Sequence, residues 1–287
     1  MCIRDRLSPD ERGLMPGTLI DAVIADAASK NIRPDLMPEF LEAMKKGATS
    51  QSENSNYGRR GTKDYLKLGY VPLTHHESVN HTLDYAFSDY CISQVAKQTG
   101  DKEISDFYAH QAKDYQNIFD SETGFMRAKD ADGNFRADFL DIRWGRDYAE
   151  GSAWQTSWSV LHDFAGLIKL HGSRENFENK LIELCNQRPN FNVEGYGFEI
   201  HEMSEMAAIE FGQVAISNQP SFHYPYLFSY IGKPWMATPL IKNLLTETFN
   251  DSPKGYPGDE DNGTMAAWYI FSSLGFYTVT AASNQYL

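Results

Sequence analysis

Helical periodicity dominates the hydrophobic pattern of the 287-residue chain. In residues 17–30 the apolar side chains recur at i, i+3 and i+4 spacing, which predicts a helix with one apolar face. That face consists of Leu19, Ile20, Val23 and Ile24. Residues 77–100 repeat the pattern with Val79, Leu83, Ala86 and Tyr90, and Gly100 provides a stop signal. By the same criteria helices are predicted in residues 17–30, 36–47, 77–100, 101–119, 151–172, 173–187, 200–212, 225–232, 234–250 and 263–276.

The predicted helices are joined mostly by short connections, which favours an all-α fold of packed antiparallel helix pairs. Strand-like alternation is scarce, and a small hairpin is predicted in residues 123–138 with its turn at Asp132 and Gly133. No repeat of fixed period and no domain boundary after residue 15 is found. A toroid of helix pairs would gather its loops at one end, and a functional site is expected there.

The two ends of the sequence suggest a piece of a longer protein. Residues 1–6, MCIRDR, contain no apolar stretch of the kind found in secretion signals, and we interpret them as a non-native leader. Residues 7–287 are then expected to form one helical domain that is truncated at both ends.

Charge narrows the classes of partner. The chain has 26 basic and 39 acidic residues, a net charge of −13, which disfavours binding to nucleic acid or to an anionic membrane. No apolar run approaches the roughly 20 residues of a membrane span. A neutral ligand, or a cation held among carboxylates, fits this composition better.

The stretch GDEDNG, residues 258–263, places Asp259, Glu260 and Asp261 between two glycines. A structural explanation is a solvated acidic turn whose Asn262 caps the following helix. The stretch is not an EF-hand loop, because the ligand positions 5 and 12 would be glycine and isoleucine. Crowded acids of this kind also suit a catalytic role.

A second candidate is Glu150, which precedes the predicted helix carrying Trp154, Gln155 and Trp158. Indoles beside a carboxyl suit a sugar ring, since the ring can stack on them and dry surroundings raise the pKa of the acid. The structural alternative is an acid at a helix N-terminus beside core tryptophans. A distant acid together with the pair Asp259 and Asp261 is the equipment that an inverting glycosidase needs.

The stretch YGFEIHEMSEM places His201 beside Glu202 and four residues before Glu205. It is not the HExxH zinc motif, because Glu205 stands where the second histidine should be. The carboxylates and the imidazole could bind a hard cation or sugar hydroxyls, and a solvated acidic helix face is an equally common explanation. Further along, Asn218 and His223 lie in an aromatic-rich turn, where a lone histidine is usually a core residue.

These stretches together resemble glycoside hydrolase family 92, the calcium-dependent, inverting, exo-acting α-mannosidases. The resemblance spans roughly residues 15–282 and is carried by HESVNHTLDYAFSDYC, YAEGSAWQTSWSVLHD, GYGFEIHEMSEM, NQPSFHYPYLFSYIGKPW and GYPGDEDNGTMAAWYIFSSLGFYTV. It implies an (α/α)6 barrel, incomplete here, and an N-terminal β-sandwich domain of the parent chain that is absent from this sequence. It also implies a secreted or periplasmic parent and a mannose-containing glycan as substrate.

The resemblance assigns roles to individual residues. Glu150 matches the general acid, and Asp259 and Asp261 match the acidic pair that supplies the base, with Asp261 preferred. His201 and Glu202 match a pair that contacts the leaving sugar in α-1,2-specific members. The remaining expected substrate-binding residues are Trp154, Gln155 and His223, and the expected calcium ligands are Glu205 and Asn218.

The chain departs from the family pattern at one place. Where many members read NEP followed by two histidines, this chain reads Asn218, Gln219, Pro220 and then Phe222 and His223. One charge and one imidazole are therefore replaced. Two other hypotheses remain: a non-catalytic mannan-binding relative, and another (α/α)6 glycosidase such as a glucosidase or trehalase.

Overall fold

The computed structural model describes residues 18–54, 57–283 and 285–287. The expected leader, residues 1–6, lies outside this part of the chain. The helices are α2 (Ile20–Ser29), α3 (Met37–Thr49), α4 (Thr62–Leu68), α5 (Ser78–Thr99), α6 (Lys102–Gln111), α7 (Ala153–Thr156), α8 (Phe164–Leu170), α9 (Arg174–Asn186), α10 (His201–Ile209), α11 (Tyr224–Tyr230), α12 (Pro234–Glu247) and α13 (Thr264–Leu274). Short 3-10 turns are η1 (Pro34–Leu36), η2 (Asp114–Ile118) and η3 (Gln219–Ser221), and the strands are β1 (Phe119–Asp120), β2 (Phe125–Met126), β3 (Arg143–Gly145) and β4 (Asn192–Gly195).

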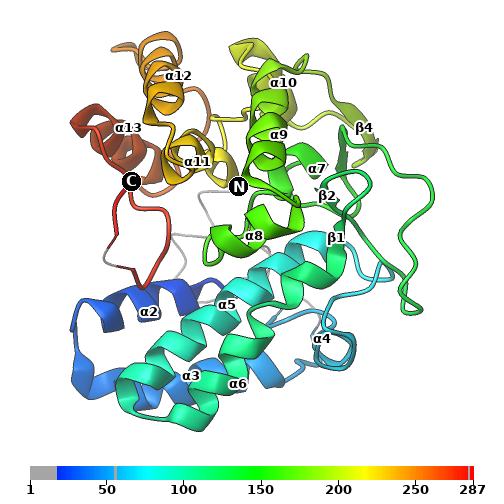
Figure 1. Ribbon diagram of the computed structural model, residues 1–287, viewed down its shortest axis with the longest axis vertical. Helices are drawn as coiled ribbons and strands as arrows, with labels where there is room; N and C mark the ends of the chain where they lie inside the picture. Colours follow the sequence, from blue (N-terminus) through cyan, green and yellow to red (C-terminus); the bar gives the residue numbers. More distant parts are fainter. Residues whose placement is uncertain (1–17, 55–56, 284) are drawn as a thin grey trace.

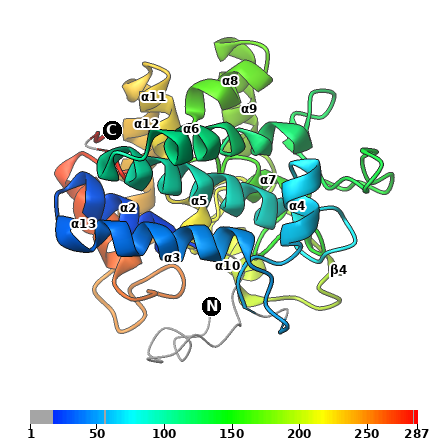
Figure 2. The same ribbon diagram turned by 90° about the horizontal axis from the view of Figure 1, so that it is seen from below.

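Helix α5 organises the first half of the molecule. It packs against α2, α3 and α6, and Figure 2 shows α3, α5 and α6 lying side by side. Val79, Leu83 and Ala86 are buried, as their spacing predicts. The helix ends at Gly100, whose φ of 85° is the left-handed conformation that closes many helices. In Figure 1 the helices from α7 to α13 form the other half of the molecule, above α5.

The predicted apolar face of α2 is wrong. Ile20 and Val23 are 63% and 64% exposed, and the helix instead turns Asp21, Ala25 and Ala28 towards the interior. Small alanine side chains allow α2 to lie close to α5, and Asp21 faces the buried guanidinium of Arg59 at 3.9 Å. The hydrophobic pattern of residues 17–30 cannot show that Arg59, far along the chain, draws Asp21 into the interior.

The single helix predicted for residues 151–172 is also wrong, because α7 and α8 are separate short helices. The Ser157 hydroxyl bonds back to the carbonyl of Ala153 and accepts the amide of Met126, which draws the chain away from helical geometry. Asp163 then caps the N-terminus of α8 through the amide of Gly166 at 2.8 Å.

Two small sheets connect the helices. β1 and β2 pair antiparallel, and an isolated bridge between Lys129 and Phe135 confirms a hairpin around Gly133. β3 and β4 pair in parallel, and this pairing requires a glycine at position 195, since a Cβ there would lie 2.0 Å from the carbonyl oxygen of Trp144. The parallel pair brings the segment before Glu150 next to the segment before His201.

The predicted all-α class is confirmed. The main core contains the fully buried indoles of Trp154, Trp158 and Trp268, and a second buried cluster lies between α2, α3, α5 and α6. Within the described residues, no helix combines the length and apolarity needed to cross a bilayer.

Candidate active site

Glu150 lies on the loop between β3 and α7, and its backbone is firmly held. Its amide donates to the hydroxyl oxygen of Tyr196 at 2.8 Å, and the neighbouring amide of Ala149 donates to Oδ1 of Asn80 at 2.9 Å. Glu150 has a φ of 46°, in the left-handed region that costs a non-glycine residue about 1–2 kcal/mol. Such strain persists where surrounding contacts enforce it, and it is often found at functional sites.

The capping of α7 does not require Glu150. Ser152 is the N-cap residue, and it forms a reciprocal capping box with the side chain of Gln155. The alternative of an acid that only favours the N-terminal dipole of this helix does not account for the side-chain contact of Glu150 with Asn218.

Two consecutive side-chain amides link the candidate acid to the candidate base. Nδ2 of Asn218 donates to Oε2 of Glu150 at 3.0 Å, and Nε2 of Gln219 donates to Oδ2 of Asp261. Glu150 and Asp261 are 111 positions apart in the sequence, yet the N-cap residue and the first residue of η3 bind the two carboxylates. The structure thus brings the predicted acid and base to one place.

The three acids of residues 258–263 have three different environments. Glu260 caps α13, because its carboxylate accepts the amides of Gly263 and Ala266 at 2.5 and 3.0 Å. The prediction that Asn262 makes this cap is therefore wrong. Asp261 is only 2% exposed and turns inward, whereas Asp259 is exposed. Helix capping thus gives Glu260 a structural role, but it gives none to the side chains of Asp259 and Asp261.

Gly258 allows the acidic loop to approach the loop that carries Asn218 and Gln219. A Cβ at position 258 would lie 2.2 Å from the carbonyl oxygen of Ser217, a distance that only glycine avoids. This close approach brings Asp261 within reach of the Gln219 side chain.

His201 and its acidic neighbours form the outer part of the candidate site at the start of α10. Nδ1 of His201 lies 3.0 Å from Oε1 of Glu205, and Nε2 lies 3.3 Å from Oε1 of Glu202. Burial lowers the pKa of His201, but the Glu205 hydrogen bond and the charges of Glu202, Glu205 and Asp259 outweigh it and raise that pKa overall. The charge of Asp259 therefore acts on this group from the acidic loop.

Two residues at the site, Glu77 and Tyr196, were not among the predicted ones. Burial raises the pKa of Glu77, the charges of His76 and Arg60 oppose this shift, and the charge of Glu150 adds to it. Both residues lie in stretches that resemble the family. The available signals were an acid at the start of α5 and a tyrosine between two glycines.

Three predicted substrate-binding residues have structural partners in the core. Trp154 is 1% exposed and donates through Nε1 to Asp141 at 3.0 Å. Gln155 belongs to the capping box, and Nε2 of His223 lies 2.9 Å from the carbonyl oxygen of Trp158. Burial lowers the pKa of His223 to about 4. Their contribution to substrate binding stays a prediction.

The expected calcium ligands suit a hard cation in their chemistry. Glu205 and Asn218 supply carboxylate and amide oxygens, the donors that calcium prefers. Burial raises the pKa of Glu205, and the charges of Glu202 and Asp259 act in the same direction, although its hydrogen bond to His201 opposes them. An added cation would relieve this repulsion. Within the described part of the chain, no cluster of three or more His, Cys, Asp or Glu side chains is already arranged to hold a metal.

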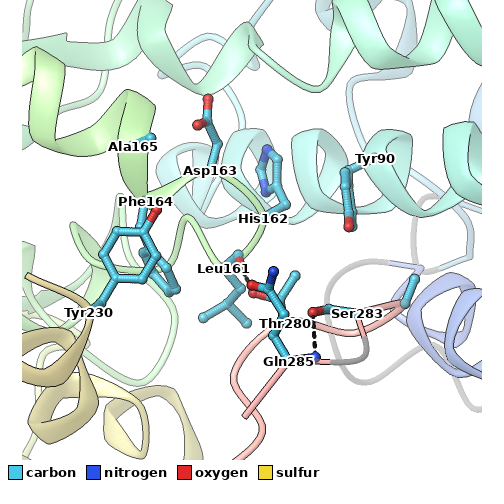
Figure 3. A pocket seen from close by; sticks show the side chains of 11 residues that line it. Tyr90, Leu161, His162, Asp163, Phe164, Ala165, Tyr230, Thr280, Ser283 and Gln285 are labelled. Atoms are coloured by element: carbon cyan, nitrogen blue, oxygen red, sulfur yellow. Dashed lines mark hydrogen bonds between the residues drawn. The ribbon is translucent and has the colours of Figure 1, made fainter. Parts of the chain in front are cut away.

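A separate cavity of about 530 Å³ is lined by Tyr90 of α5, by residues 161–165 and, near the C-terminus, by Thr280, Ala282, Ser283 and Gln285 (Figure 3). Its aromatic rings already contact other rings, because Tyr90 stacks on His162 at 5.5 Å and Phe164 meets Tyr230 at 5.2 Å. None of the predicted site residues lines it. Its volume alone does not make it the better candidate, since the paired carboxylates lie elsewhere.

The fold and the paired carboxylates define a helical glycosidase domain as the class. A model of the glycosyl hydrolase family 92 catalytic domain matches residues 4–287, and the chain belongs to that family. The predicted family is confirmed, and the helical architecture agrees with solved catalytic domains of the family and is consistent with an (α/α)6 barrel.

Solved structures and a curated protein extend this comparison. The chain is 40% identical to a family GH92 inverting mannosidase from Bacteroides thetaiotaomicron VPI-5482, with a TM-score of 0.85 over 98% of this chain and 38% of that one. It is 30% identical to a GH92 alpha-mannosidase from Bacteroides thetaiotaomicron in complex with mannoimidazole, with a TM-score of 0.84 over 96% and 36% of the two chains. An uncharacterized secreted glycosidase from Arthroderma benhamiae is 25% identical over 91% of this chain and 35% of its own length. The chain thus spans between a third and two fifths of these relatives.

Proposed function

We propose that the protein carrying this domain is an exo-α-mannosidase that removes non-reducing terminal mannose from glycans by an inverting mechanism. The observation that carries the proposal is the binding of Glu150 and Asp261 by the consecutive amides of Asn218 and Gln219. The likeness to solved mannosidases of the family supports the choice of sugar.

In the proposed reaction, Glu150 donates a proton to the glycosidic oxygen as the bond to the anomeric carbon breaks. Asp261, assisted by Asp259, accepts a proton from a water molecule whose oxygen attacks the anomeric carbon from the opposite face. Glu150 is left ionised and Asp261 protonated, and the α-linked sugar leaves as β-mannose. Burial of Asp261 beside Gln219 supports a fixed base rather than a solvated one.

His201 and Glu202 are proposed to bind the leaving sugar. Glu202 is buried and His201 exposed, so the pair extends from the interior of the site towards solvent, as a leaving group would. Polar groups built to bind sugar hydroxyls reject linkages that leave them unpaired, which supports selection among linkages, and the resemblance of this pair to α-1,2-specific members favours α-1,2 bonds.

Calcium is proposed as the cofactor, with Glu205 and Asn218 among the residues that would hold it. Oxygen donors from these two residues would hold the cation, which would supply positive charge for binding sugar hydroxyls. The negative charge around His201 supports the binding of a cation at this end of α10.

We further propose that a β-sandwich domain of the same parent completes the pocket and that the parent is secreted or periplasmic. The small share of the relatives that this chain spans supports the first point, and the printed name of the Arthroderma relative supports the second. Comparing the mannosidase activity of residues 7–287 with that of a longer protein carrying them tests the domain proposal, and full activity of residues 7–287 would contradict it.

The catalytic assignment is tested by leaving-group dependence, in this chain and in any longer protein that carries it. Glu150→Gln should slow the hydrolysis of α-1,2-mannobiose by about 10²–10⁴-fold and largely spare a dinitrophenyl mannoside, whose leaving group needs no proton. Asp261→Asn should slow both substrates, because each needs an activated water. Glu199→Gln, on an exposed side chain of the same surface, serves as the control.

Proton NMR of the first product should show the β-anomer. Retention of configuration, or equal sensitivity of both substrates to Glu150→Gln, would remove Glu150 and Asp261 from these roles. Binding of mannan without hydrolysis would favour a non-catalytic relative, and hydrolysis of glucosides alone would favour another glycosidase.

A further inference from the structure

The hydroxyl of Tyr196 contacts the backbone amide of the proposed acid. The amide of Glu150 donates to the Tyr196 oxygen at 2.8 Å. Tyr196 directly follows β4, which pairs in parallel with β3, and β3 leads into the loop that carries Glu150. The contact therefore joins two segments that the small parallel sheet already holds together.

The position of the Tyr196 ring is built into the fold. Gly145 ends β3 with a φ of 78°, and a Cβ there would lie 2.6 Å from the ring, so the tyrosine lies directly against this glycine. The amide of Gly145 in turn donates to the carbonyl of Gly151, which closes the loop around Glu150. The ring and the loop thus fit each other closely.

The Tyr196 phenol stays protonated at neutral pH. Burial raises its pKa to about 12, and the charges of Glu77, Glu150 and Glu202 add to this shift, although the bond from the Glu150 amide opposes it. A protonated phenol whose oxygen accepts an amide proton keeps its own proton for donation. Three carboxylates lie close enough for their charges to act on it.

We propose that Tyr196 is a positioning residue for the general acid: its hydroxyl holds the left-handed backbone of Glu150 and thereby directs the carboxyl towards Asn218. The proposal rests on the proposed function, in which Glu150 protonates the leaving oxygen. Without the hydroxyl, the amide of Glu150 loses its acceptor, and its backbone can relax towards the conformations that non-glycine residues prefer. The carboxyl then spends less time where it can protonate the leaving group.

The test compares Tyr196→Phe with Tyr148→Phe. Tyr148 is a buried tyrosine of the same loop, and its hydroxyl donates to the carbonyl oxygen of Met126 at 2.9 Å, so its loss removes a hydroxyl hydrogen bond that does not involve the Glu150 amide. Tyr196→Phe should lower kcat on α-1,2-mannobiose by about 10–100-fold and change kcat on a dinitrophenyl mannoside less than threefold. Tyr148→Phe should affect both substrates equally. A merely structural role for Tyr196 would also affect both equally and would overturn the proposal.

Hydrogen exchange measured by mass spectrometry supplies a second readout that needs no turnover. Peptides covering residues 145–152 should exchange at least tenfold faster at the Glu150 amide in Tyr196→Phe, and at the wild-type rate in Tyr148→Phe. Unchanged exchange in Tyr196→Phe would overturn the proposal whether or not the chain hydrolyses mannosides.

The variant Glu150→Gln separates the two ideas. If Glu150→Gln discriminates between the two substrates and Tyr196→Phe does not, the positioning role fails and the proposed function stands. If Glu150→Gln itself shows no discrimination, the general acid is misassigned, and the positioning role fails with it even where the exchange result holds.

Discussion

The side-chain amide of Gln219 donates a hydrogen bond to the buried carboxylate of Asp261. By the family pattern that the sequence resembles, a glutamate is expected where this chain has Gln219. The amide supplies a donor to Asp261 at a point where a glutamate would bring a second negative charge. A glutamine at position 219 therefore lowers the negative charge at the site and holds the proposed base, Asp261, by a hydrogen bond from a neutral group.

We expect Gln219→Glu to lower the thermal midpoint in the presence of a chelator, because it places two carboxylates in contact within a buried site. Added calcium should then raise the midpoint more in the variant than in the wild type, since a ligand that binds only the folded state stabilises it in proportion to its affinity. Differential scanning fluorimetry with and without calcium measures both effects, and zinc should not replace calcium.

Gln187→Glu is the control for this prediction. The side-chain amide of Gln187 also donates to a carboxylate, that of the exposed Glu183 at 3.1 Å, at the C-terminal end of α9. The variant Gln187→Glu should show the same rise of the thermal midpoint on adding calcium as the wild type. Equal calcium responses of Gln219→Glu and the wild type would place the cation, if one binds, away from Gln219.

Glu202 is expected to set linkage preference rather than to break the bond. Loss of a buried hydrogen bond to a charged group costs about 1.5–3 kcal/mol, so Glu202→Ala should reduce cleavage of α-1,2-mannobiose by about 10–100-fold. Cleavage of an aryl mannoside, which lacks the leaving sugar, should change far less. Steady-state kinetics on both substrates decide the matter, and Glu199→Ala on the neighbouring exposed side chain is the matched variant. Equal losses on both substrates would assign Glu202 to the core chemistry or to folding.

The sequence predicted best where a single element contains the whole signal. Local periodicity predicts helix α5 and a glycine stop predicts its end at Gly100; the helix and its end are both confirmed. Crowding among acids indicates Asp261, nearby indoles indicate Glu150, and the family resemblance implies both; the structure brings these two acids together through Asn218 and Gln219.

The sequence failed where partners lie far apart in the chain. The break between α7 and α8 depends on the hydrogen bond from Met126 to Ser157, which helical periodicity cannot reveal. The indole of Trp154 turned into the core because Asp141 accepts its proton there. The two glycines beside Tyr196 predict a close approach of the backbone, but they do not reveal that its hydroxyl contacts the distant backbone amide of Glu150.

The buried ionic cluster around Arg59 should make stability depend on pH. Nη1 of Arg59 binds Asp89 at 2.7 Å, while Asp21 lies 3.9 Å from Nη2. Burial raises the pKa of Asp21 from 3.8 to about 7, with the charge of Asp89 adding and that of Arg59 opposing. Because the folded pKa lies above the unfolded one, the stabilisation is complete below about pH 4 and is lost as the pH rises through 7.

Asp21→Asn should remove this dependence, since asparagine is neutral throughout. Between pH 4 and 7 the free energy of unfolding of the wild type should fall relative to the variant by at most about 4 kcal/mol. Urea denaturation at several pH values measures the difference between the two proteins. Asp106→Asn, an exposed acid paired with Lys102, should keep the wild-type pH dependence. A constant difference between Asp21→Asn and the wild type across this range would contradict the assigned shift.

Gly258 is expected to be indispensable to the geometry of the acidic loop. In Gly258→Ala the new methyl group would meet the Ser217 carbonyl oxygen at 2.2 Å, and two backbones would have to separate. Overpacking of this kind costs about 1–3 kcal/mol, and the separation should also pull Asp261 away from Gln219.

The control is Gly47→Ala in α3, where a Cβ would meet nothing within 4 Å and where alanine should stabilise the helix by up to about 1 kcal/mol. Urea denaturation should therefore shift in opposite directions for the two variants, and mannosidase activity should fall only in Gly258→Ala. Stability and activity of Gly258→Ala that match those of Gly47→Ala would mean that the close approach of the two loops is not needed to place Asp261.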